Sequence, residues 1–331
     1  MRIVLDAMGG DHAPPAAVEG GVWAAREYGV EVVLVGQEEL LRQELSRHNT
    51  AGLTLPIVHA SEVIGMEDEP ATAAKSKQDS SMAVGMNLLK SGEADGFFSA
   101  GNSGGVMAAA LFGLGRIPGV KRPALSALYP TTKGSCVILD VGANTDCKPE
   151  WLVQFGIMGS AYAETALGVA SPRVGIVSNG EEEGKGSTLV KEAYALFKES
   201  PLNFIGNVEG KDIPAGLADV VVTDGLTGNV IIKLSEGLTK LLTNVILAEI
   251  KSSVITSVGG ALARPAFKRA KRVLDYTDVG GVPLLGVNGV VLVGHGRSNA
   301  KAIKNGIGGA LRAAEGGMLE AITSRLSQMP L

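Results

Sequence analysis

Short runs of apolar, mostly β-branched residues alternate along the chain with longer segments in which apolar residues recur every three or four positions. The short runs are almost continuously apolar, which is typical of strands covered on both faces. They predict strands at Arg2–Leu5, Glu31–Val35, Leu55–His59, Gly96–Ser99, Ala124–Leu128, Val137–Val141, Val174–Val177, Asn203–Ile205, Val220–Thr223 and Val290–Val293.

The longer segments have the spacing of helices that bury one face. They predict helices at Pro15–Tyr28, Glu38–His48, Ser80–Ser91, Ser103–Leu114, Pro149–Gly168, Ser187–Glu199, Asn229–Ser252 and Ser298–Leu326. The alternation predicts an α/β fold, a three-layer αβα sandwich with a mainly parallel sheet. No linker rich in Pro, Gly and Ser divides the chain, so we expect residues 1–331 to form one domain. A second lobe stays open as an alternative, but no residue marks where it would begin.

One segment departs from the alternation, because two helical stretches follow each other from Asn229 with a predicted break at Ser257–Gly260. We expect residues 229–274 to form a helical hairpin that projects from the sheet. Its tip would be apolar (Ile255, Val258, Leu262) and would lie beside a basic run (Arg264, Lys268, Arg269, Lys271, Arg272). The run is either a solvated helix face or a contact surface for an acidic protein or an anionic membrane.

Composition narrows the class of protein. Apolar residues make up 45% of the chain, enough to build a core, and the net charge of −4 argues against nucleic acid as a partner. Two cysteines cannot form a disulfide framework. The start lacks a signal-peptide pattern, and the longest weakly polar stretch, Gly280–Gly294, is too short to span a bilayer. We therefore expect a cytoplasmic protein.

Glycine accounts for 45 of the 331 residues, and many glycines stand with Asp, Asn or Ser directly after a predicted strand. Ligands bind at the carboxyl ends of parallel strands, and a helix that follows such a loop favours an anion. Four loops have this form: Asp6–His12, Ala100–Gly105, Gly142–Asp146 and Asp224–Asn229. We expect the four loops to share one sheet edge and to form a site there for a phosphate- or carboxylate-bearing ligand, although ordinary glycine turns and helix caps are the alternative.

Familiar nucleotide signatures are absent. No predicted strand is followed by Gly-x-Gly-x-x-Gly, which argues against a dinucleotide site. Gly180–Ser187 approaches a P-loop, but only three residues separate its first two glycines, all three are glutamates, and Gly186 follows Lys185. Lys185 is thus either a ligand for a single phosphate or a solvated loop lysine.

Few other residues suggest chemistry. His12 and His295 stand in Gly-flanked turns and are either general acid–base groups or turn residues. Cys147 precedes Pro149 at a helix start and is either a nucleophile or structural, whereas Cys136 lies in an apolar strand. No His, Cys and Asp cluster has metal-ligand spacing, so we expect no metal.

These clusters, in this order, resemble the bacterial phosphate acyltransferases of phospholipid synthesis, which transfer an acyl group from acyl carrier protein to inorganic phosphate. The matching segments are Asp6–Asp11, Lys77–Met82, Ser99–Gly104, Leu139–Asn144, Cys147–Pro149, Gly206–Gly210, Asp224–Asn229 and His295–Gly296. They extend over nearly the whole chain. Gly175–Gly180 departs from the family pattern in one loop.

The resemblance implies a fold like that of phosphate acetyltransferases and isocitrate/isopropylmalate-type dehydrogenases. It also implies a homodimer that uses the paired helices, and a peripheral association with the membrane. There the acyl phosphate would pass to a membrane glycerol-phosphate acyltransferase for phosphatidic acid synthesis.

Acyl transfer from a thioester to phosphate needs no metal or redox cofactor, because phosphate can attack the carbonyl directly while the protein positions it and stabilises the oxyanion. We expect phosphate to bind among Gly9, Gly10, Gly101, Asn102, Ser103, Gly104, Gly225, Thr227 and Gly228, with Lys185 supplying charge. Asn144 or Asn229 would donate to the oxyanion, and His12 or His295 would protonate the leaving thiolate. Asp6, Asp11, Asp140 and Asp224 would brace the loops.

Three alternatives stay open. The acyl donor could be a coenzyme A thioester instead of a carrier protein. A dehydrogenase of related fold is disfavoured by the missing dinucleotide signature. A non-enzymatic binding module would not need so many polar glycine loops.

Overall fold

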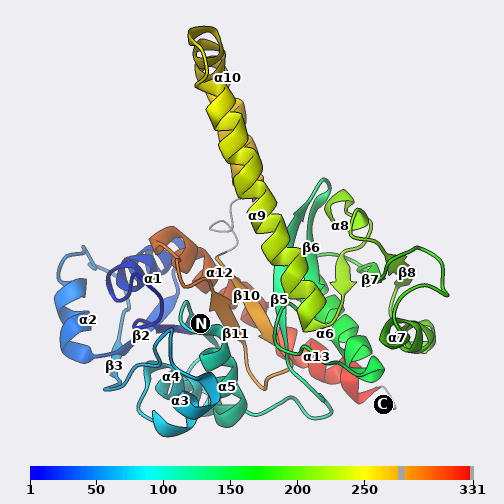
Figure 1. Cartoon of the computed structure of the whole chain (residues 1–331). Helices are drawn as coiled ribbons and strands as arrows, with labels where there is room; N and C mark the ends of the chain where they lie inside the picture. Colours follow the sequence, from blue (N-terminus) through cyan, green and yellow to red (C-terminus); the bar gives the residue numbers. More distant parts are fainter. Residues whose placement is uncertain (275–279, 329–331) are drawn as a thin grey trace.

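An eleven-stranded sheet extends through the computed structural model, which describes residues 1–274 and 280–328, with only the backbone for 271–274 (Figure 1). Its order is β3-β2-β1-β4-β11-β10-β5-β6-β9-β7-β8. The strands are β1 (Arg2–Asp6), β2 (Glu31–Gly36), β3 (Ile57–His59), β4 (Gly96–Ser99), β5 (Ala124–Thr131), β6 (Gly134–Leu139), β7 (Val174–Val177), β8 (Phe204–Val208), β9 (Val220–Val222), β10 (Gly281–Leu285) and β11 (Val291–Gly294).

Helices cover both faces of the sheet, which confirms the three-layer α/β fold. One face carries α1 (Pro15–Tyr28), α2 (Glu38–Leu45), α6 (Pro149–Leu167), α7 (Thr188–Glu199), α12 (Ala300–Glu315) and α13 (Met318–Ser327) over one continuous core. The other carries α3 (Pro70–Ser76), α4 (Ser81–Lys90), α5 (Ser103–Gly113), α8 (Asp212–Ala215) and the start of α9 (Gly225–Ile250). On that second face the core is divided into two clusters, one in each half of the sheet.

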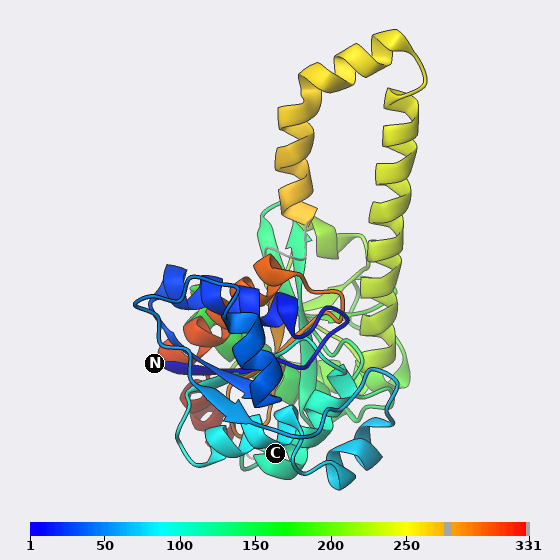
Figure 2. The same ribbon diagram turned by 90° about the vertical axis from the view of Figure 1, so that its left-hand side faces the viewer.

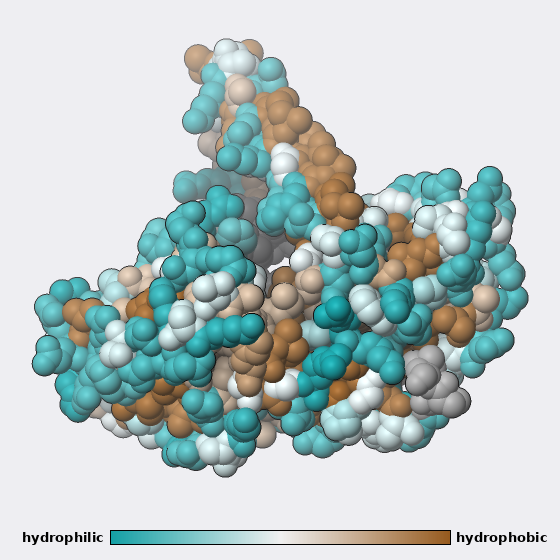
Figure 3. Space-filling model, turned by 60° about the horizontal axis from the view of Figure 1, so that its bottom comes forward, coloured by the Kyte–Doolittle hydropathy of each residue, from teal (hydrophilic) through white to brown (hydrophobic). Residues whose placement is uncertain are grey.

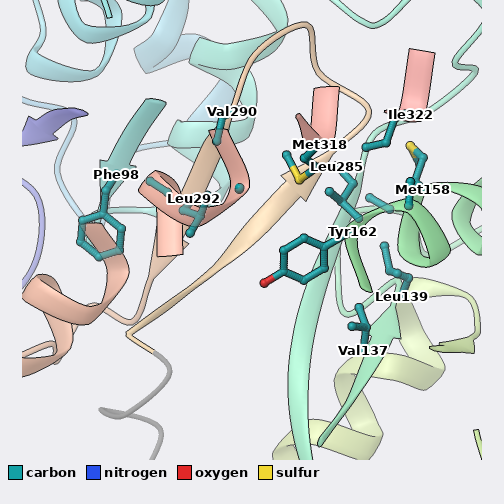
Figure 4. Packing of buried hydrophobic residues seen from close by; sticks show 14 of the residues in the cluster. Phe98, Val137, Leu139, Met158, Tyr162, Leu285, Val290, Leu292, Met318 and Ile322 are labelled. Atoms are coloured by element: carbon teal, nitrogen blue, oxygen red, sulfur yellow. The ribbon is translucent and has the colours of Figure 1, made fainter. Parts of the chain in front are cut away.

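The continuous core joins the two halves of the molecule. Figure 4 shows Phe98 and Leu292 on one side of β10 and Met158 and Tyr162 of α6 on the other, all within the same cluster. Phe98 is completely buried, and a Cβ on Gly306 of α12 would lie 2.1 Å from its ring. This glycine is therefore required for packing, which is one reason that the chain is rich in glycine.

The predicted elements agree with the structure to within a few residues, with three omissions and one split. The sequence pattern missed β10, which contains Pro283, and the short helices α3 and α8. The helix predicted at Ser298–Leu326 is two helices, because Gly317 adopts a left-handed φ of 68° between α12 and α13. Only glycine tolerates that backbone without strain.

The expectation that the four glycine loops share one sheet edge is wrong. Strands β1, β4 and β11 are parallel to each other, and β6, β9 and β7 are likewise parallel to each other. Between these groups, however, the pairs β11–β10, β10–β5 and β5–β6 are all antiparallel. Three reversals make the two groups run in opposite directions. The loops after β1 and β4 therefore lie at one edge, and those after β6 and β9 at the other.

A hairpin of α9 and α10 (Val254–Leu274) projects from the body, and its two helices diverge along most of their length (Figure 2). The break lies at Lys251–Ser253 and not at Ser257–Gly260, which is helical. Ser253 explains this position, because its Oγ accepts a hydrogen bond from Thr256 N (3.2 Å) and so caps α10. Of the helices in the described part of the chain, none is long and apolar enough to cross a membrane.

Candidate functional site

The loop after β1 is built around the buried carboxylate of Asp6. Its Oδ2 accepts a hydrogen bond from Ser99 Oγ (2.6 Å) at the end of β4, and its Oδ1 accepts one from Met8 N (3.1 Å). A Cβ on Gly9 would lie 2.4 Å from Asp6 Oδ2, so only glycine allows the loop to pass this close. Burial raises the pKa of Asp6 despite these hydrogen bonds. The contacts are those of a carboxylate that braces two loops.

The loop after β11 joins this edge. Asp11 N donates a hydrogen bond to Gly296 O (2.8 Å), and a Cβ on Gly10 would lie 3.2 Å from the carbonyls of both Ala100 and Gly296. His12 lies exposed in the same β1 loop, and its carbonyl accepts from Ala16 N. The loops after β1, β4 and β11 therefore form one contiguous surface.

Helix α9 crosses from the opposite edge and places Lys233 and Glu236 close to this surface. The two side chains form an ion pair (Nζ–Oε2 3.0 Å), and both act electrostatically on His295. Burial, followed by the cations of Arg297 and Lys233, lowers the pKa of His295 below its ordinary 6.5. Its imidazole is therefore neutral at neutral pH. We call Asp11, Lys233, Glu236, His295 and Arg297 the His295 cluster.

The start of α5 lies at the same edge. Asn102 Oδ1 caps the helix by accepting from Gly105 N (3.1 Å), and its Nδ2 donates to the carbonyls of Gly65, Met66 and Asp68. Asn102 is thus a structural tie and not a phosphate ligand, and Gly101 N already donates to Ser99 Oγ (3.0 Å).

Ser103 and Gly104 are the first residues of α5, where N–H groups have no partner within the helix. The positive end of the helix dipole adds to this preference for an anion. These two amides remain suited to phosphate.

The loop after β6 is saturated with hydrogen bonds. The completely buried carboxylate of Asp140 accepts from the backbone N–H groups of Leu125, Gly142, Ala143 and Asn144. Asn144 Nδ2 donates both of its protons, one to Asp140 Oδ2 (2.9 Å) and one to Pro123 O (2.8 Å). The expectation that Asn144 donates to an oxyanion is therefore wrong, because its amide is already used to brace the loop.

The start of α9 is likewise satisfied within the protein. Gly225 N donates to Asn144 O (2.7 Å), Thr227 N to Asp224 Oδ1 (2.9 Å), and Gly228 N to Asp224 O (2.9 Å). Asp224 is the N-cap of α9, a position that fits the loop-bracing role predicted for it. Gly225, Thr227 and Gly228 have no amide left for phosphate, which corrects their assignment. Asn229 lies exposed one position further along α9.

The two groups of loops are also far apart across the sheet. Strand β9 lies five positions from β4, about 24 Å at the usual strand spacing, and β7 lies six positions away, about 29 Å. Lys185 follows β7 in an exposed loop, and its side chain lies over Gly180. The strand order therefore gives no support for Lys185 beside Gly101–Gly104, and its role as a phosphate ligand stays a prediction.

Cys147 is not an activated thiol. Burial raises its pKa to about 12, and the carboxylate of Asp140 acts in the same direction. Burial likewise raises the pKa of Cys136, in β6, to about 12. Both cysteines are free, and neither supplies a thiolate at neutral pH.

Three carboxylates, Glu181, Glu209 and Asp212, lie within ligand distance of one another. Lys211 Nζ pairs with two of them, at 3.4 Å from Glu181 and 2.5 Å from Glu209. The lysine already balances much of their charge, so the cluster is a surface ion-pair network.

Sequence reasoning missed Lys233, Glu236 and Arg297. The first two lie on the helix assigned to the hairpin, and no spacing links them to His295, because the contact arises only where α9 crosses the sheet. Arg297 could have been identified from the sequence, because it stands two residues after His295 in a glycine turn. Ser298 was missed as well: it is 3% exposed, and its Oγ is buried without a hydrogen-bond partner.

Comparisons with known proteins place the chain in a family. The family model "Fatty acid synthesis protein" matches residues 1–321. The chain is 50% identical to a phosphate acyltransferase of Geobacter sp. (strain M21) over 99% of this chain and 92% of that protein. It is 51% identical to one of Geobacter sulfurreducens over 93% and 89%, respectively.

Solved structures show the same fold. A phosphotransacetylase from Streptococcus pyogenes superimposes with a TM-score of 0.61 at 18% identity, covering 98% of this chain and 93% of that one. The corresponding values for a phosphotransacetylase from Staphylococcus aureus are 0.60, 18%, 96% and 94%. At this identity, the likeness concerns the fold alone.

Proposed function

Because the chain belongs to the phosphate acyltransferase family and is therefore an acyltransferase that uses phosphate as acceptor, we propose that its donor is a fatty acyl thioester of acyl carrier protein. The product would be acyl phosphate for phosphatidic acid synthesis. The observation that carries the site is the His295 cluster, in which two cations and a neutral imidazole from separate parts of the chain meet beside the free amides of α5.

In this site phosphate lies between Arg297, Lys233 and the N–H groups of Ser103 and Gly104. Guanidinium and ammonium groups form charge-assisted hydrogen bonds with phosphate oxygens, and the helix start adds a favourable dipole. The Lys233–Glu236 ion pair is exposed on both sides, so Lys233 can exchange its partner for phosphate at little cost.

A phosphate oxygen attacks the thioester carbonyl carbon. A carbon–oxygen bond forms, the carbon–sulfur bond breaks, and the proton of hydrogen phosphate passes to the leaving thiolate. His295 Nδ1 accepts a hydrogen bond from Arg297 N (3.3 Å), so the neutral imidazole carries its proton on Nε2 and can donate a hydrogen bond to the oxyanion. His12 and Asn229 are the remaining candidates for hydrogen bonds to the oxyanion.

The first experiment mixes the purified protein with inorganic phosphate and long-chain acyl–acyl carrier protein and assays acyl phosphate and free carrier thiol. Equal amounts of both products are expected. Turnover of acyl-coenzyme A alone would assign the protein to the coenzyme A-dependent type, which is the second candidate because the fold matches phosphotransacetylases.

We further propose that a second copy of the chain covers the part of α9 from Leu234 to Val245. Leu234, Leu238, Leu241 and Val245 are 49–60% exposed and are spaced by four, three and four residues, the spacing of a coiled-coil seam. They contribute to an apolar stripe along the hairpin that Figure 3 shows. Leu238→Glu should give a monomer in sedimentation velocity. Lys240→Glu, on the polar side of α9, should leave the dimer intact; a dimer that survives both changes would contradict the proposal.

The hairpin tip is proposed to touch the cytoplasmic face of the membrane. Ile255 is 84% and Leu262 79% exposed, and Val258 and the basic residues Arg264, Lys268 and Arg269 lie near them on α10. Lys271 and Arg272 lie outside the described side chains. The double variant Ile255→Ser/Leu262→Ser should lose binding to anionic vesicles in flotation assays, whereas equal flotation with the unaltered protein would refute the contact.

A further inference from the structure

A basic pocket lies outside the His295 cluster, where the end of α5, the segment 116–123 and the start of α6 meet. Its volume is about 560 Å³. The side chains that give it its character are Arg116, Lys121, Arg122, Lys148 and Trp151. All four cations are exposed, and Glu150 supplies one carboxylate among the described lining residues. The pocket is therefore strongly positive in a chain whose net charge is −4.

Contacts hold two of these cations in place. The Arg122 guanidinium lies 5.1 Å from the centre of the Trp151 ring, a cation–π arrangement, and Arg116 Nη1 donates to the carbonyl of Lys121. Like charges gathered in this way repel one another, and an anionic occupant would relieve the repulsion. The charge pattern thus indicates an anionic partner.

The pocket adjoins the start of α9. Its lining residue Pro123 accepts a hydrogen bond from Asn144, and Asn144 O in turn accepts one from Gly225 N. From Gly225 to Lys233 the helix rises about 12 Å, so α9 connects the pocket with the His295 cluster. Leu226 and Val230 are 58% and 54% exposed along this stretch. Their spacing of four places them on one face, with Lys233 three residues further along it.

We propose that this pocket receives the carrier-protein end of the acyl donor, an inference that rests on the proposed function. The occupant is an acidic protein surface together with the phosphodiester that joins its prosthetic arm. The arm then lies along the exposed side of α9, with Leu226 and Val230 against its apolar part, and the thioester reaches the His295 cluster. The basic run on α10 is less suited, because it belongs to the projecting hairpin and not to the body that holds the cluster.

The test measures the binding of unacylated, fluorescently labelled holo-acyl carrier protein by anisotropy, so no turnover is needed. Lys148→Glu and Arg122→Glu should each weaken binding at least tenfold and reduce its salt dependence. Lys191→Glu on α7, an exposed lysine with the same charge change, should match the unaltered protein. Pocket variants that bind like Lys191→Glu would overturn the proposal, as would a loss confined to Lys268→Glu on α10.

Kinetics with two donors separates docking from chemistry. For acyl–acyl carrier protein the pocket variants should raise KM at least tenfold and leave kcat unchanged, whereas for acyl-pantetheine, which lacks the carrier, both constants should stay the same. An equal loss with both donors would place the pocket in the reaction site or in the fold and overturn docking. If the unaltered protein binds the carrier at the pocket but forms no acyl phosphate, the proposed function fails and the docking site stands.

Discussion

Two regions of this protein look alike in the sequence and differ in the structure. Each has an apolar strand with a buried Asp at its last position (Asp6) or directly after it (Asp140), and a glycine-containing loop follows each. Asp6 accepts from Met8 N and Ser99 Oγ, whereas Asp140 accepts from four backbone N–H groups and the Asn144 amide. Both carboxyl groups have pKa values raised by burial.

The difference lies in what remains available after the internal bonds are made. Around Asp140, loop and helix start satisfy each other, and α9 packs directly on the loop backbone. Around Asp6, the loop edge stays open, and the half-buried His295 and exposed Arg297 and Lys233 face it. A glycine loop at a strand end therefore serves either as a structural joint or as a ligand site. What distinguishes the two is whether the backbone amides at the following helix start are already bonded within the protein, as at Gly225 and Gly228, or lack a partner within the helix, as at Ser103 and Gly104.

The largest effect on stability should come from a substitution that separates the start of α9 from the loop after β6. A Cβ on Gly228 would lie 1.9 Å from the Asp140 carbonyl oxygen, and this buried backbone has no room to move, so Gly228→Ala should lose about 3 kcal/mol or more of unfolding free energy. Urea denaturation measures this loss of unfolding free energy. Gly237→Ala is the control on the same helix: its Cβ would have no neighbour within 4 Å, and helix propensity predicts a gain of up to about 1 kcal/mol. Equal stabilities would contradict the packing of α9 on the loop.

Exchanging each buried carboxylate for its amide tests the comparison directly. In Asp140→Asn the new NH₂ group faces backbone donors, so buried N–H groups lose their acceptor and about 2 kcal/mol of stability should be lost. In Asp6→Asn the amide oxygen still accepts from Met8 N, and the expected loss is below about 1 kcal/mol. Thermal unfolding of both variants provides the measurement. A larger loss for Asp6→Asn would reverse the roles assigned to the two loops.

Substitutions at the open edge around Asp6 should change enzymatic activity and leave the free energy of unfolding nearly unchanged. Lys233→Ala should raise the KM for phosphate about tenfold, because a charge-assisted hydrogen bond of roughly 1.5 kcal/mol is lost, while the unfolding free energy changes little. Lys185→Ala should leave this KM within about twofold, since its loop lies at the other edge. Steady-state assays at varied phosphate decide between them. If the effects were exchanged, phosphate would bind near β7.

The smallest effect concerns pH. The pKa of His295 is lower in the folded protein than its ordinary 6.5, so the unfolded chain binds the proton more readily. The contribution of this group to stability is therefore complete above about pH 6.5 and declines as the pH falls towards the lowered value. Urea midpoints between pH 7.5 and 5.5 should fall slightly less in His295→Asn than in the unaltered protein. The same slope in both would show that burial and the cations of the cluster do not lower the pKa of His295 in the folded protein.

Most of the secondary structure could be predicted from the local pattern of apolar and polar residues. Continuous apolar runs identified ten of the eleven strands, because burial on both faces selects such residues whatever their neighbours. β10 was not predicted, because Pro283 and the flanking glycines interrupt its apolar pattern. Caps set the helix ends, and the sequence placed the hairpin break at a Gly pair although the Ser253 cap determines it.

By itself, the sequence determined the α/β class, the family resemblance and the polar loops at strand ends, since each of these follows from residues close together in the chain. Only the tertiary structure decided which loops meet. Three antiparallel pairs at the centre of the sheet separate Asn144 and Lys185 from the edge that holds His295. Two of them join consecutive strands, but the third, β10–β5, is long-range, because it places Leu284 opposite Leu125. The same long-range pairing brings Lys233 to His295, because a helix that starts at one edge of a sheet extends to the other.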